Sequence, residues 1–186
     1  MSKNIFTTAG HSLTQGGASA NGLREELLAI KDKELLVKQL EFQSKYTDLE
    51  IISDDDIDSL QTVINKVKKQ AEKDDLLLDI HYNSATPKAT GAEAFIKVGA
   101  SETSRRTAER IVEVFSKMMG IPNRGVKLEN QSQHNRLGIL HATDHAVLLE
   151  VGFITNTVEM ERVEEFRERL WIAVANILIQ ERLKLT

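Results

Sequence analysis

One apolar run constrains the fold of this 186-residue chain more than any other segment. Residues 146–151 read Ala-Val-Leu-Leu-Glu-Val, and Gly152 follows them. Short runs rich in aliphatic and β-branched side chains are typical of strands that are covered on both faces. Glu150 is placed at the exit of this strand, where a carboxylate is poorly solvated unless it has a partner or a chemical role. The run therefore predicts a buried strand that delivers an acid to a site.

Strand patterns alternate with helical patterns along the rest of the chain. Strands are predicted at 4–9, 49–53, 76–80, 91–96, 137–140 and 146–151, and helices at 22–43, 60–71, 104–119 and around 163–177. Segments of both kinds in this order favour a single α/β sandwich with a largely parallel sheet. The continuously apolar run at 76–80 is expected to be a central strand, and the Gly/Ser-rich residues 12–21 an ordered loop.

Composition excludes several classes of protein. The chain carries 41% hydrophobic and 28% charged residues, as soluble domains do, and no apolar run approaches the roughly 20 residues that a membrane span needs. A net charge of −4 with scattered Lys and Arg argues against a nucleic-acid surface. Cysteine is absent, so any metal site must use His and carboxylates. The first residues lack the apolar core of a secretory signal, so synthesis in the cytoplasm without a signal peptide is expected.

Three polar residues follow predicted strands. His11 comes after 5–10, His81 after 76–80, and Glu150 ends the run at 146–151. Because sites collect at the carboxyl ends of parallel strands, we expect these side chains to share one edge of the sheet. Zinc in hydrolases typically takes three ligands from His and Glu, and a further carboxylate handles protons. His11 and His81 would be two ligands, Glu25 or Glu26 the third, and Glu150 the base.

Each of these residues also has an ordinary interpretation. A single His after a strand is commonly a hydrogen-bonded loop residue, and a Glu in a first helical turn commonly interacts with the helix dipole. Position and residue type alone therefore leave a zinc site and an ordinary set of loop residues as alternatives.

Five segments in sequence order resemble the zinc-dependent N-acetylmuramoyl-L-alanine amidases of the amidase_3 type. They are Thr8–His11 with Gly17-Ala18 and Asn21–Glu25, then Asp79–Ser84, Gly91–Phe95, Asn123–Lys127 and Val147–Asn156. The resemblance implies a three-layer α/β domain with a six-stranded mixed, largely parallel sheet flanked by helices. It implies that His11, Glu25 and His81 bind Zn²⁺, which selects Glu25 over Glu26, and that Glu150 is the catalytic acid and base.

The implied reaction is hydrolysis of the amide between the lactyl group of N-acetylmuramic acid and L-alanine in peptidoglycan. Candidate substrate contacts are Asn83, Glu93, Arg124, Lys127 and Asn156. Arg124 and Lys127 would bind a stem-peptide carboxylate, although solvated loop charges are the ordinary alternative. Glu93 would support a ligand or contact substrate, or be a plain strand carboxylate. Asn83 and Asn156 would position substrate, or simply form turns.

The chain departs from the family pattern at four places. Thr8 stands where the family usually has Asp, Asp79 stands where Ser is common, and Ser12-Leu13 replaces a glycine pair. The family's Thr-Arg segment after the second strand is Ser53–Asp56 here. These differences are expected to affect substrate fit and the surroundings of the metal more than the reaction.

Two other functions remain alternatives: a zinc peptidase or deacylase acting on another amide, and a non-catalytic peptidoglycan-binding module. Residues 1–186 have the size of a bare catalytic domain, so no separate wall-binding domain is expected. Action on the cell wall would then follow release by other means, as for a phage endolysin, with a host autolysin or spore enzyme as alternatives. The sequence leaves the oligomeric state open.

Overall fold

Six strands form one mixed sheet in a computed structural model that describes residues 3–185. The expected domain of residues 1–186 includes Met1, Ser2 and Thr186, which lie outside the described residues. The strand order is β4-β1-β5-β8-β6-β7. The bounds are β1 Lys3–Ala9, β4 Leu49–Ser53, β5 Leu76–Asn83, β6 Ala92–Ile96, β7 Asn123–Leu128 and β8 His145–Phe153. Strands β4, β1, β5 and β8 are parallel, β6 is antiparallel to β8, and β7 is parallel to β6. The predicted six-stranded, mostly parallel sheet is confirmed.

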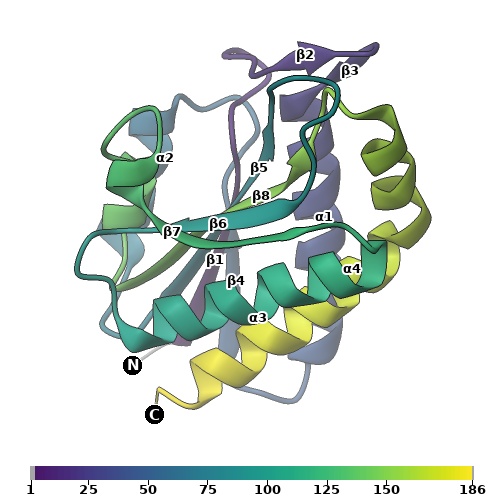
Figure 1. Ribbon diagram of the computed structural model, residues 1–186. Coiled ribbons are helices and arrows are strands. Elements are labelled where there is room, and N and C mark those ends of the chain that lie inside the picture. The colour runs from purple at the N-terminus through teal and green to yellow at the C-terminus, as the bar shows by residue number, and fades with distance from the viewer. Residues whose placement is uncertain (1–2, 186) are drawn as a thin grey trace.

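Helices cover both faces of this sheet and complete three layers. The α-helices are α1 Glu25–Gln43, α2 Leu60–Gln70, α3 Glu102–Met119 and α4 Thr157–Leu183, and the 3₁₀ helices are η1 Glu129–Gln131 and η2 Gly138–His141. Figure 1 shows α3 and α4 side by side along the sheet, with α2 on the opposite side. Helix α1 joins α3 and α4 on their face, so within residues 3–185 the second face is covered by α2 and η2 alone. No helix in residues 3–185 has the length and apolar character that crossing a membrane requires.

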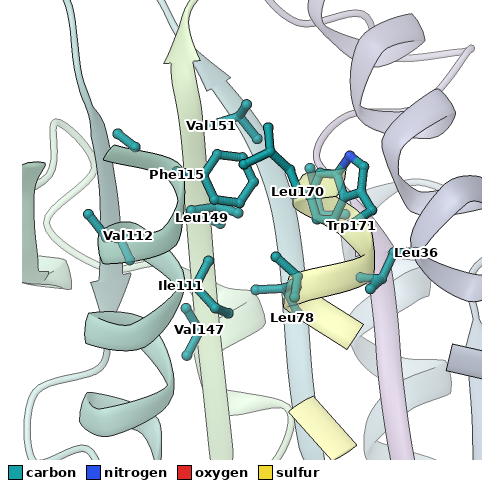
Figure 2. Close-up of a cluster of buried hydrophobic side chains, with 14 of the residues drawn as sticks. Leu36, Leu78, Ile111, Val112, Phe115, Val147, Leu149, Val151, Leu170 and Trp171 are labelled. Atoms are coloured by element: carbon teal, nitrogen blue, oxygen red, sulfur yellow. The ribbon is translucent and has the colours of Figure 1, made fainter. Parts of the chain in front are cut away.

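The main core lies between the sheet and the helices α1, α3 and α4. Figure 2 shows Leu149 of β8 beside Phe115 of α3 and Val147 of β8 beside Ile111 of α3, with Leu78 of β5 on the side of Trp171 of α4. The two aromatic rings meet edge to face with centroids 5.6 Å apart, a geometry worth about 0.5–1.5 kcal/mol beyond the area that it buries. Period-2 alternation of apolar residues along both strands thus fixes one face of the sheet against three helices.

A buried ionic group ties α1 to α4 within this core. Asp32 of α1 is fully buried, and its carboxylate accepts hydrogen bonds from the hydroxyl of Tyr82, the guanidinium of Arg167 and the indole N–H of Trp171, the last at 2.8 Å. Burial raises the pKa of Asp32, and these donors oppose the rise. The buried charge is therefore paired and hydrogen-bonded, as a charge in an apolar interior must be.

The opposite face carries a smaller apolar cluster. Phe6, Leu77 and Leu148 of the sheet pack there against Val63 of α2 and Leu140 of η2. This cluster covers only part of the strands, and polar side chains replace apolar ones toward their carboxyl ends. The thinly covered end of this face is where a cleft opens.

Some predicted elements differ from the structure. Residues 137–140 do not form a strand: 138–141 is the 3₁₀ helix η2, whose Ile139 and Leu140 are buried. The sixth strand is instead β7, a segment for which the sequence predicted no strand. Its residues are largely polar and are exposed or half-buried, as on a sheet edge. The helix predicted from residue 22 begins at Glu25, because Leu23–Arg24 (β3) pairs with Ser19–Ala20 (β2) in a short hairpin.

Candidate metal centre

His11, Glu25 and His81 come together at the carboxyl end of the parallel strands. One ligand atom from each residue lies within 4.8 Å of the others, and the group could hold a metal ion. The Nδ1 atom of His81 lies 3.1 Å from Oε1 of Glu25, and Nε2 of His11 lies 3.5 Å from Oε2 of the same carboxylate. The sequence predicted that His11 and His81 follow their strands, and in the structure His81 lies within β5, which extends to Asn83.

Two glycines make this close approach sterically possible. A Cβ atom at Gly10 would collide with the imidazole ring of His81, and one at Gly17 would lie 2.5 Å from both Oε2 of Glu25 and Cδ2 of His11. His11 itself has a φ of 66°, in the left-handed region that few non-glycine residues occupy. The backbone on either side of the site is therefore shaped around the three side chains.

Glu25 is the first residue of α1, and its side chain turns toward the histidines. Its carboxylate accepts hydrogen bonds from the backbone N–H groups of Ala18, at 2.9 Å, and Tyr82, at 3.2 Å. Burial acts to raise the pKa of Glu25, but the hydrogen bond and charge of His81, the backbone N–H of Ala18 and the charge of His11 hold it below its usual value. Glu26 faces elsewhere: its carboxylate accepts from the backbone of Gly17 at 3.2 Å and pairs with Arg24. Of the two candidates, only Glu25 joins the histidines.

His81 is held from its other side by Asp79, a contact that the sequence interpretation missed. Oδ2 of Asp79 lies 3.0 Å from Nε2 of His81, and Thr8 donates its hydroxyl to Oδ1 at 2.6 Å. Burial lowers the pKa of His81, but the charges and hydrogen bonds of Asp79 and Glu25, with the charge of Glu150, raise it well above its usual value. The signal available in the sequence was spacing: residues two apart on a strand share a face.

Thr8 and Asp79 are two of the positions at which the sequence departs from the family pattern. The register of β1 and β5 places them directly opposite one another. The two departures are therefore neighbours in space, and together they hold one ring of the candidate metal group.

Glu150 lies beside the metal group on the neighbouring strand. The register of β5 and β8 pairs it with His81, and that of β6 and β8 pairs it with Glu93. Its Oε2 atom is buried and has no hydrogen-bond partner in residues 3–185. Burial raises the pKa of Glu150 to about 7; the charge of His81 opposes this rise, while Glu25, Glu93 and Asp79 add to it. A carboxyl group with a pKa near neutrality is suited to both accept and donate a proton.

These residues line a cleft of about 930 Å³, whose wall beyond Glu150 is charged. Glu93 accepts hydrogen bonds from Asn83 at 2.8 Å and from Arg124 and Lys127, each at 2.6 Å. Two basic side chains thus share one carboxylate, which leaves one positive charge in excess on this wall. All four residues line the cleft, and loop residues between 131 and 139, which the sequence did not indicate as site residues, form another part of its lining.

Asn156 has a different environment. Its side chain caps α4 by accepting a hydrogen bond from the backbone N–H of Glu159 at 3.1 Å, and its amide donates to the carbonyl of Ala89 at 3.0 Å. It is not among the residues that line the cleft. Its side-chain donors and acceptors are thus used to begin a helix, as is usual for Asn at this position.

A six-stranded α/β sheet with a His, Glu and His group and a further carboxylate in one cleft has the architecture of a hydrolytic enzyme with a candidate metal centre. The profile of one family matches residues 5–179, and that family is N-acetylmuramoyl-L-alanine amidase (Amidase_3). This chain belongs to that family.

Individual relatives include an endolysin and an amidase. The endolysin of Bacillus phage SPP1 is 31% identical over 170 residues, and the N-acetylmuramoyl-L-alanine amidase CwlM of Bacillus licheniformis is 30% identical over 163 residues. Each alignment covers 86% of this chain but only 58% and 60% of the respective relative, so both relatives are longer. The crystal structure of an N-acetylmuramoyl-L-alanine amidase from Clostridium difficile 630 has the same fold, with a TM-score of 0.75, 22% identity, and coverage of 98% of this chain and 96% of that one.

Proposed function

We propose that this domain is a zinc-dependent amidase that hydrolyses the bond between the lactyl group of N-acetylmuramic acid and L-alanine in peptidoglycan. Membership of the N-acetylmuramoyl-L-alanine amidase family supports the substrate. The observation that carries the proposed chemistry is the convergence of His11, Glu25 and His81 beside an unpartnered oxygen of Glu150. The domain of residues 1–186 would act on the cell wall, in the manner of a lysin or an autolysin.

The donor set fits zinc. Catalytic zinc sites take three protein ligands, two histidines and a glutamate in one common set, and leave a position for water. His11, Glu25 and His81 offer two imidazoles and one carboxylate within 4.8 Å, and they lie in a cleft open to substrate. Zinc bound by such ligands makes water more acidic and polarises the carbonyl oxygen of the amide.

Glu150 supplies the proton transfers. Its carboxylate takes a proton from the attacking water as the water oxygen bonds to the lactyl carbonyl carbon. It then gives this proton to the amide nitrogen as the carbon–nitrogen bond breaks, and L-alanine leaves as an amine. The buried Oε2 atom has no other hydrogen bond among residues 3–185 to compete with these transfers. Such catalysis typically contributes about 10²–10⁴-fold to the rate.

The charged wall of the cleft is suited to the stem peptide. Arg124 and Lys127 both pair with Glu93, and their excess positive charge would attract a stem-peptide carboxylate. Asn83 would orient the substrate from the same wall, since its amide already donates to Glu93. A role for Asn156 would be indirect, through the start of α4.

End-group analysis tests the proposal. Zinc-loaded protein should release new L-alanine amino termini from peptidoglycan without new reducing sugar ends, and chelation should abolish this release until zinc is restored. Glu150→Gln should retain zinc and lose turnover. Glu25→Gln should lose zinc, whereas Glu26→Gln is the matched control because Glu26 faces Gly17 and Arg24.

Other outcomes refute parts of the proposal. New termini at other stem residues would show a zinc peptidase. No new ends with zinc in place would show a binding module or another amide substrate. Release of L-alanine termini that persists after complete zinc removal would exclude the metal from the reaction.

A further inference from the structure

Asp79 is a buried carboxylate next to the candidate metal ligands. Its side chain is 4% exposed, and each of its two oxygens has a specific partner. Oδ1 accepts from the hydroxyl of Thr8 at 2.6 Å, and Oδ2 lies 3.0 Å from Nε2 of His81. Burying a carboxylate is costly unless it is hydrogen-bonded, so this arrangement calls for a compensating role.

We propose that Asp79, held by Thr8, is a positioning residue that selects which nitrogen of His81 binds zinc. A neutral imidazole carries one N–H and one lone pair. Because a carboxylate can only accept, Asp79 keeps the N–H on Nε2 and leaves the lone pair on Nδ1. Nδ1 is the atom that lies 3.1 Å from Oε1 of Glu25, another member of the candidate metal group. This inference rests on the zinc site of the proposed function.

The same contact fixes the orientation of the ring. His81 contacts Glu25 with one nitrogen and Asp79 with the other, so the imidazole is held from two opposite directions. A carboxylate that accepts from the second nitrogen of a metal-binding His orients the ring and makes it a better ligand. Asp79 stands two residues before His81 on β5, so both side chains emerge on the cleft face of that strand.

Thr8 completes the unit from the neighbouring strand. It is 2% exposed, and the register of β1 and β5 places it directly opposite Asp79. Its hydroxyl satisfies the oxygen that His81 does not use, which keeps the carboxylate from rotating away. Removing the hydroxyl leaves a buried acceptor unpaired, a change felt at His81 although Thr8 does not touch the ring.

Zinc affinity, measured by competition with a chromogenic chelator, tests this role. Asp79→Ala should weaken affinity about 10–100-fold, the usual effect of losing such a partner. Asp79→Asn should recover part of the loss, because its carbonyl still accepts from Nε2–H. Thr8→Val should weaken affinity less than Asp79→Ala. The control is Asp75→Asn: Asp75 is also buried and bonds the backbone N–H of Asn4 at 2.9 Å, outside the site.

Nuclear magnetic resonance of the His81 ring nitrogens gives a second readout that a purely structural role would not change. Zinc-loaded wild type should show a protonated Nε2 and a metal-bound Nδ1, and Asp79→Ala should show a second ring state. Should Asp79→Ala fail to fold, Asp79→Asn and Thr8→Val carry the same test.

The outcomes separate the two proposals. If wild type binds zinc and releases L-alanine termini, while the Asp79 variants keep both wild-type affinity and wild-type ring signals, the positioning role is wrong and the amidase proposal stands. A metal-bound Nε2 in wild type would also refute the positioning role alone. Wild type that binds no zinc would overturn both. An equal loss of affinity in Asp75→Asn would assign the effect to general destabilisation.

Discussion

The buried carboxylate of Glu150 should lower the free energy of unfolding of the metal-free protein at neutral and higher pH. Replacing Glu150 with Gln should remove this destabilisation. Burial raises the pKa of Glu150 to about 7, whereas an unperturbed Glu has a value of 4.5. Between these two values the native carboxyl holds a proton that the unfolded chain has already released. The contribution of Glu150 to the free energy of unfolding is therefore most favourable below about pH 4.5, and it falls as the pH rises toward 7.

The size of the cost follows from the gap between the two pKa values. A gap of about 2.5 pKa units, at about 1.4 kcal/mol each, gives a ceiling of about 3.5 kcal/mol above about pH 7. Water that reaches the partly exposed side chain reduces this figure, so about 2–3 kcal/mol is expected. Gln has nearly the same shape but no charge to desolvate. In the presence of a chelator, the free energy of unfolding of Glu150→Gln should therefore exceed that of the wild type at about pH 8 and equal it at about pH 4.5.

Urea denaturation of both proteins in chelator, in steps from about pH 4.5 to 8, measures this difference. Glu41→Gln, at an exposed carboxylate on α1, should show no comparable pH-dependent gain. With zinc restored, Glu150→Gln should be the more stable but inactive protein, as expected where an active site trades stability for function. A stability difference that does not vary with pH, or a less stable Glu150→Gln at high pH, would refute the reasoning.

Three further predictions concern the site and its supports. Gly17→Ala should abolish zinc binding with little change in circular dichroism, because its Cβ would lie 2.5 Å from two of the candidate ligands; Gly16→Ala, whose nearest new contact is 3.3 Å, should bind zinc normally. Asp32→Ala should lower the free energy of unfolding by about 3–5 kcal/mol in urea denaturation, because the buried guanidinium of Arg167 loses its buried carboxylate partner and keeps the exposed Glu164. Burial acts to raise the pKa of Glu181, but three basic side chains lower it to about 2. The ionised Glu181 should therefore stabilise the native state fully above pH 4.5, and this stabilisation should disappear as the pH falls through about 2. Glu181→Gln should be less stable than wild type at neutral pH, and urea denaturation should show that this difference vanishes in acid.

The sequence predicted best where side-chain chemistry and fold agree. Central strands β5 and β8 are apolar over most of their length. Helix α3 ends at Met119, as predicted, and Gly120 follows it in the left-handed conformation that is common after a helix. The strand predicted at 137–140 was wrong, because a segment that packs against α2 needs apolar side chains whether its backbone is a strand or a 3₁₀ helix. Length and hydrophobicity of four residues carry no information on that choice.

The candidate site shows the same limit. Convergence of His11, His81 and Glu150 follows from parallel strands, which the pattern predicts. The choice of Glu25 over Glu26 depends on the β2–β3 hairpin and on Arg24, because adjacent helical residues point about 100° apart and only tertiary contacts decide which faces the cleft. Asp79 was interpreted only as a departure from a family pattern. Its role is visible once the register with Thr8 is known.

The alternation of β5 explains how one strand serves both the core and the site. Leu78, Ile80 and Tyr82 face the helices α1, α3 and α4, while Leu77, Asp79 and His81 face the thinly covered side. A shift of register by one residue would exchange these sets and bury a carboxylate and an imidazole in the apolar core. The charged residues of the cleft therefore help to specify the register of the sheet. The Oε2 atom of Glu150, which has no hydrogen-bond partner in residues 3–185, lies at the end of the face that α2 and η2 leave open, and the same opening would admit a substrate.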